Sequence, residues 1–78
     1  MKKEKLVLFS ERLKALRQEK RLKQSDIADL LDCGVRHYQK IEYGEVNIPS
    51  LDLLFLAEYF EVSTDYLLGR TDVREVCR

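Results

Sequence analysis

Residues 24–44 read QSDIADLLDCGVRHYQKIEYG, and the fold is decided in this stretch. Apolar residues recur at helical spacing over residues 24–31 and again from residue 35 to about residue 43. The segment DCG, residues 32–34, interrupts the pattern between them. Two short helices joined by a tight turn that contains glycine form a helix-turn-helix arrangement.

The second of these helices has two different sides. Tyr38 and Ile41 are spaced i, i+3, and we expect them to face inward. The residues opposite them form one stripe that contains no acid: Val35, Arg36, Gln39, Lys40 and Tyr43. Arg and Lys can donate to guanine O6 and N7, Gln can pair with adenine, and Val can pack on a thymine methyl group. This stripe, called the outward face below, is suited to reading bases, although an ordinary solvated helix face could have the same composition.

The length and composition indicate one small domain, residues 1–78, whose stability depends on close packing or on oligomerisation. Hydrophobic residues make up 45% and charged residues 36% of the chain, which is typical of a compact helical domain. No apolar run is long enough to span a membrane, and the run at residues 6–9 is too short for a signal peptide. We therefore expect a cytoplasmic protein.

Metal-binding and catalytic chemistry have little support in the sequence. Cys33 and Cys77 form no CxxC pair and His37 is the only histidine, so the ligands for a metal site are missing. We expect two free thiols, with Cys33 packed as a small hydrophobe. The sequence also lacks a nucleophile–base–acid set and a glycine-rich phosphate loop. It predicts no enzymatic activity, no cofactor, no metal and no small-molecule ligand.

Charge is unevenly distributed although the formal net charge is zero. Residues 1–40 hold eleven Lys and Arg against six acids, whereas residues 41–78 hold three Arg against eight acids. A protein with such a dipole can bind phosphate with its basic face while the far end stays acidic. A first helix that is merely soluble would give similar counts, so the distribution supports nucleic-acid binding without deciding it.

Three more helices are expected around the first two. A helix over about residues 5–20 carries one apolar stripe at positions 6, 9, 13 and 16. Ser50 is expected to cap a helix over residues 51–60. Because that helix is apolar on nearly all sides, it is expected to belong to the core or, alternatively, to provide a dimer contact through residues such as Phe55 and Tyr59.

The end of the chain contains a shorter helix. Ser63 is expected to cap residues 64–68, and Gly69 to end the helix in the left-handed conformation. The tail, residues 70–78, is expected to fray or to form a short helix that docks or dimerises. With no alternating strand pattern, the chain is predicted to be an all-α bundle with its core at about residues 9–69.

In their order and spacing these features resemble the phage-repressor-like, Xre/Cro-type helix-turn-helix family, over roughly residues 9–72. The matching segments in chain order are RLKALRQEKRLKQ, SDIADLLDCG, HYQKIEYG, NIPS, LAEYFEVS and TDYLLGRTD. The resemblance implies a compact, five-helix, lambda-repressor-like bundle in which the second and third helices form the helix-turn-helix.

The resemblance also implies a sequence-specific DNA-binding transcriptional regulator, expected to be a repressor. It would bind a two-fold symmetric operator in double-stranded DNA as a homodimer, with residues 35–43 in the major groove. The positions that match base-contacting positions of the family are Val35, Arg36, Gln39 and Lys40. The positions that match backbone-contacting positions are Arg12, Gln24, Tyr43 and Gly44, with His37 as a less central contact.

The alternative is an antitoxin-like or adaptor module that binds a protein through the fourth helix and the tail. Zero net charge and the apolar fourth helix favour it.

Four positions depart from the family's pattern. Arg21 and Asp32 stand where glycine is usual, and Lys23 and Gly34 stand where a Ser or Thr cap is usual. Each departure is expected to cost about 0.5–1 kcal/mol of local stability.

Overall fold

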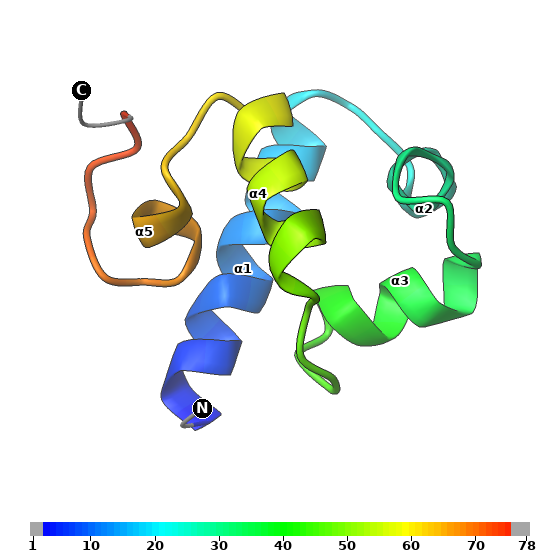
Figure 1. Ribbon diagram of the computed structural model, residues 1–78, viewed down its shortest axis with the longest axis horizontal. Coiled ribbons are helices and arrows are strands. Elements are labelled where there is room, and N and C mark those ends of the chain that lie inside the picture. The colour runs from blue at the N-terminus through cyan, green and yellow to red at the C-terminus, as the bar shows by residue number, and fades with distance from the viewer. Residues whose placement is uncertain (1–2, 76–78) are drawn as a thin grey trace.

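The computed structural model describes residues 3–75, and over that range the chain is helical with no strand (Figure 1). The helices are α1 (Lys3–Glu19), α2 (Gln24–Leu30), α3 (Val35–Glu42), α4 (Ser50–Tyr59) and α5 (Thr64–Leu67). The predicted all-α, five-helix bundle is therefore confirmed.

The helix-turn-helix lies at one end of the molecule (Figure 1). The principal extents are 32 × 25 × 21 Å. Along the longest of them, α2 and α3 lie at one end, α5 and the chain that follows it lie at the other, and α1 and α4 cross between them (Figure 1). This arrangement leaves one side of α3 without a covering helix.

The core is built from one side of each helix. The stripe of α1 is buried at Phe9, Leu13 and Leu16, as the i, i+4, i+7 spacing predicts. Tyr38 and Ile41 of α3 are fully buried, which confirms the prediction of its inward side. The remaining buried apolar residues are Ile27, Ala28, Leu56, Ala57, Phe60, Val62 and Leu67. Leu22 and Cys33 pack against this cluster from the two turns that flank α2.

The fourth helix is only partly a core helix. Leu56 and Ala57 are buried, whereas Leu51 is 79% exposed and Leu54 and Phe55 are also exposed. One side of α4 thus belongs to the core, and the alternative of a dimer contact through its exposed side stays a prediction. Ser50 is the first residue of α4 and not its cap, because Pro49 occupies the cap position with an extended backbone.

The five described helices all end in the same backbone motif. In each, a residue with φ between 54° and 82° follows the C-cap. The next N–H then donates to a carbonyl five residues earlier, as in a Schellman motif. Two of the left-handed residues are Gly44 and Gly69, and three carry side chains: Arg21, Asp32 and Glu61. The unusual residues at positions 21 and 32 therefore stand where the backbone favours glycine.

Residues 70–75 form an irregular segment, called the strap below, so the short helix that was one of the two expectations for the tail is not formed there. The carbonyl of Arg74 accepts a hydrogen bond from the Ser63 N–H (2.7 Å). The Arg74 guanidinium pairs with the Glu19 carboxylate at 2.5 Å, so the strap is tied to both α5 and α1. Val76 and Cys77 lie outside the described residues, so the expectations for them are untested.

A second arginine holds the strap from the other side. Arg12 of α1 donates to the Thr71 carbonyl and to the Asp72 carboxylate, both at 2.7 Å, and also to the Tyr66 carbonyl. The Tyr66 ring lies 4.2 Å from the Arg12 guanidinium and 5.5 Å from that of Arg74. The strap is thus docked by paired charges and cation–π contacts and not by an apolar helix face.

The left-handed ends predict where stability can be gained. Glu61→Gly is expected to raise the free energy of unfolding by up to about 1 kcal/mol, because it relieves a left-handed residue that carries a side chain. Glu58→Gly, inside α4, is the matched control and should lower it by about 1 kcal/mol. Urea unfolding measures both, and a shift in the same direction for the two variants would contradict the assignment.

The strap predicts a shifted titration. Arg74 of the strap donates hydrogen bonds to the Glu19 carboxylate, and these bonds hold the pKa of that carboxyl below its ordinary value. Because the folded-state pKa is the lower one, this contribution to stability is fully present above the unfolded value of about 4.3 and is lost as the pH falls through the folded pKa. In Arg74→Met, NMR titration should show the Glu19 pKa moving back up. In Arg70→Met, which removes a strap cation that does not contact Glu19, it should stay low.

Candidate nucleic-acid interface

The turn between α2 and α3 is set by local bonds. Lys23 is the N-cap residue of α2 and provides no side-chain cap. Its own N–H donates instead to the Asp26 carboxylate at 2.7 Å, which ties the first turn of α2 to the residue before it. Gly34 is the N-cap of α3, as predicted, and a Cβ built on it would meet no atom within 4 Å. A Ser or Thr would fit there, so glycine at this position is not required by space.

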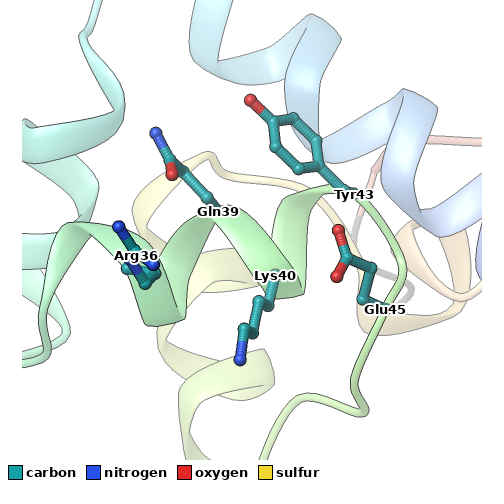
Figure 2. Close-up of a pocket in the computed structure, with 5 residues that line it drawn as sticks. All are labelled: Arg36, Gln39, Lys40, Tyr43 and Glu45. Atoms are coloured by element: carbon teal, nitrogen blue, oxygen red, sulfur yellow. The ribbon is translucent and has the colours of Figure 1, made fainter.

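The outward face is accessible as the sequence predicts. Val35, Arg36, Lys40 and Tyr43 are exposed, and Gln39 is half-buried. In Figure 2, Gln39 and Tyr43 project on the same side of α3, while Lys40 projects on the other side of the view. The helix contains one acid, Glu42, and that residue is buried with 1% of its surface exposed. The surface that α3 itself presents is therefore free of negative charge.

Glu42 is neutralised by a buried ion pair with Arg17 of α1. The Arg17 Nη2 lies 2.9 Å from the Glu42 Oε1, and its Nε donates to both carboxylate oxygens at 3.2 Å. The Arg17 Nη1 also donates to the Leu22 carbonyl at 2.7 Å, and the Ser10 hydroxyl donates to the Glu42 backbone carbonyl. These bonds join α1, the turn before α2, and α3, so they fix how α3 is presented.

This ion pair was not found from the sequence, although a signal for it is present. Arg17 follows Leu13 by four residues and Glu42 follows Tyr38 by four, so each charge lies on a buried stripe. Taken alone, Arg17 is a cation in the last turn of α1, where it suits the helix dipole. Two opposite charges on two inward stripes would have indicated the pair.

The Tyr38 hydroxyl lies close to this pair without using it. The hydroxyl is buried and has no hydrogen-bond partner among the described residues. Burial, together with the nearby Glu42 charge, raises the pKa of Tyr38 well above its ordinary value. The phenol is therefore neutral at physiological pH, and its ring fills the core from the inward side of α3.

Gln24 connects the ion pair to the outward face. Its Nε2 donates to the Glu42 Oε2 at 3.3 Å and to the Tyr43 hydroxyl at 3.2 Å. Its Oε1 accepts a hydrogen bond from the Gln39 Nε2 at 3.0 Å. Of the residues predicted to contact DNA, the structure thus brings Gln24, Gln39 and Tyr43 together.

The other predicted backbone contacts lie in different settings. His37 is exposed on α3. Gly44 donates its N–H to the Ile41 carbonyl at 3.1 Å, and this bond belongs to the backbone motif that ends α3. Arg12 is not near α3, because its guanidinium is bound to Tyr66, Thr71 and Asp72 at the opposite end of the molecule (Figure 1). These partners engage both terminal nitrogens of Arg12 and hold its guanidinium at the strap.

A shallow depression of about 230 Å³ lies on the outward face (Figure 2). Its lining residues are Arg36, Gln39, Lys40, Tyr43 and Glu45. Three of them are on α3, Tyr43 is the C-cap of that helix, and Glu45 belongs to the loop that follows. An acid therefore stands beside the acid-free stripe, at the C-terminal end of α3.

Neither a metal site nor a membrane span is found in residues 3–75. That part of the chain contains no group of three or more His, Cys, Asp or Glu side chains able to hold a metal ion. None of its helices is long and apolar enough to cross a bilayer.

Comparison with known proteins places the fold in a family. A family model described as "Helix-turn-helix" matches residues 13–67. The chain belongs to the Xre/Cro-like helix-turn-helix family. It is 35% identical over 66 residues to YobD of Bacillus subtilis (strain 168), an uncharacterized HTH-type transcriptional regulator. The aligned part covers 83% of this chain but only 58% of that relative. No solved structure matches the chain.

The buried ion pair predicts a large loss of stability when it is broken. Glu42→Gln is expected to lower the free energy of unfolding by about 3 kcal/mol or more, because Arg17 then stays buried without an opposite charge. Glu19→Gln, which breaks the exposed pair with Arg74, should have a much smaller effect. Urea unfolding compares the two, and equal losses would contradict the assignment. If Glu42→Gln does not fold, the double variant Arg17→Met/Glu42→Leu should restore folding by removing both charges.

Proposed function

We propose that the chain is a sequence-specific DNA-binding transcriptional regulator that reads the major groove with α3. The observation that carries this proposal is the outward face, where Arg36 and Lys40 are exposed on a helix whose single acid is buried. The family of the chain supports it, as does the relative named a transcriptional regulator. The B-DNA major groove is wide enough to admit an α-helix.

The proposed contacts divide into base-reading and backbone-holding groups. Arg36 and Lys40 would donate to guanine, Gln39 would pair with adenine, and Val35 would pack on a thymine methyl group. The Gln39 amide is already oriented by Gln24, so its oxygen and second N–H are turned away from that bond. The phosphates would be contacted by the backbone-holding group, which consists of Gln24, His37, Tyr43 and the turn at Gly44. Arg12 is left out, because its partners hold it at the strap.

We propose a homodimer that acts in the cytoplasm as a repressor on a two-fold symmetric operator. The support for a second copy is the exposed apolar side of α4, formed by Leu51, Leu54 and Phe55. A dimer with two copies of α3 would read half-sites about one helical turn, or roughly 34 Å, apart. A regulator bound across such a site would block other proteins from the same DNA.

The second candidate function is an antitoxin-like or adaptor module. It is favoured by the same exposed side of α4 and by an acid-lined hollow between α4, α5 and the strap, which includes Glu58, Glu61, Asp65 and Glu75. Acids at that surface would repel DNA and attract a basic partner.

Selection from a random pool of double-stranded DNA separates the two functions. A DNA-reading regulator should enrich one motif made of inverted half-sites, with an affinity that falls steeply as salt rises because phosphate contacts release counterions. If no sequence is enriched and no DNA is retained at low salt, the regulator proposal fails and the adaptor function is favoured.

Arg36 provides the sharpest single test of base reading. Arg36→Ala is expected to weaken binding to the selected site by about 1–3 kcal/mol and to relax preference at one base pair. Arg70→Ala, which removes an exposed Arg from the strap, is the control and should leave both unchanged. Titrations against the selected site and its single-base variants measure the effect. Equal loss on every sequence would show that Arg36 contacts phosphate only.

A further inference from the structure

Glu45 is held beside Lys40 by the end of α3. Gly44 takes φ 76°, which reverses the chain direction after the last turn of the helix. The Glu45 N–H then donates to the Lys40 carbonyl at 2.9 Å. Figure 2 shows the Glu45 carboxylate beyond the end of the helix, on the same depression as Lys40. The backbone position of this acid is therefore set by the helix end, five residues after Lys40.

The charges of Lys40 and Glu45 are both available to a ligand. The ion pairs of the described residues join Arg12 to Asp72, Arg17 to Glu42 and Arg74 to Glu19, and none joins Lys40 to Glu45. Both residues are exposed. The lining of the depression thus includes both a donor and an acceptor, and they do not neutralise each other in an ion pair.

The Lys40 amine, a donor, and the Glu45 carboxylate, an acceptor, complement the hydrogen-bonding groups of one base pair better than those of the others. In the major groove guanine offers the acceptors O6 and N7, and its partner cytosine offers the N4 amine as a donor. Lys bonds guanine and Glu accepts from cytosine N4, whereas a carboxylate near phosphate is only repelled. The two side chains therefore complement a G·C pair in one orientation. The reversed pair would place an amine against Lys40 and acceptors against Glu45.

We propose that Glu45 is a specificity-determining residue that accepts a hydrogen bond from cytosine N4 and reads, together with Lys40, one G·C pair in a fixed orientation. This inference rests on the proposed DNA-binding function and adds to it a residue outside α3. It also explains how Glu45 can favour binding although it lies beside a basic surface. Without a bond to a base, its carboxylate would only repel phosphate and would weaken binding to every sequence.

Two charge-matched variants test this role. Glu45→Ala and Glu58→Ala each remove one exposed acid, but Glu58 lies on α4 and not on the depression. Affinities are measured for the selected site and for copies in which each G·C pair is reversed. Glu45→Ala should reduce the discrimination between one G·C pair and its reverse by about tenfold. Glu58→Ala should preserve that discrimination, and thermal unfolding should show that both variants fold.

The possible outcomes separate the two proposals. If the wild-type chain selects no motif, the DNA-binding function fails. If the wild-type chain selects a motif and Glu45→Ala keeps every preference, or tightens binding to all sequences alike, the function stands and the role of Glu45 as a reader is overturned. Loss of preference at one G·C pair, at an unchanged preference elsewhere, supports it.

Discussion

The buried contact between Arg17 and Glu42 is the constraint on which the rest of the structure depends. It joins α1 to α3 through three nitrogen–oxygen contacts of 2.9–3.2 Å. Charges removed from water are tolerated only when their remaining donors and acceptors are satisfied. Here the Leu22 carbonyl accepts from the arginine, and Gln24 donates to the carboxylate. The orientation of α3, and hence the surface it presents, follows from this arrangement.

The same arrangement shows why charge counts along the chain overstate the cations available to a ligand. Arg12 and Arg17 belong to the basic half of the sequence, but both are engaged by acids and carbonyls of the protein itself. Arg36 and Lys40 remain exposed at the opposite end from the strap. The partners around each cation therefore decide whether a ligand can use its charge, and net charge gives little information about this.

Much of the fold and the outward face could be predicted, because those features depend on near neighbours. The spacing of Tyr38 and Ile41 identified the inward side of α3, and Ser63 and Gly69 marked the two ends of α5. The buried ion pair and the strap could not be predicted in the same way, since each joins residues 25 to 60 positions apart. A short helix was one of the two expectations for the tail, but ion pairs with Arg12 and Glu19 hold the strap in an irregular form. Glu45 was missed because its position depends on the left-handed Gly44.

The repeated backbone motif at the helix ends has a consequence for how the chain folds. Each end is closed by bonds between residues three and five positions apart, so the helix ends depend on local contacts and need no distant segment. Chains dominated by local contacts fold quickly, and the remaining barrier lies in bringing remote segments together. In this protein that step is the meeting of α1 and α3, in which two charged side chains must lose their water. We therefore expect dehydration of one ion pair, and not helix formation, to set the folding rate.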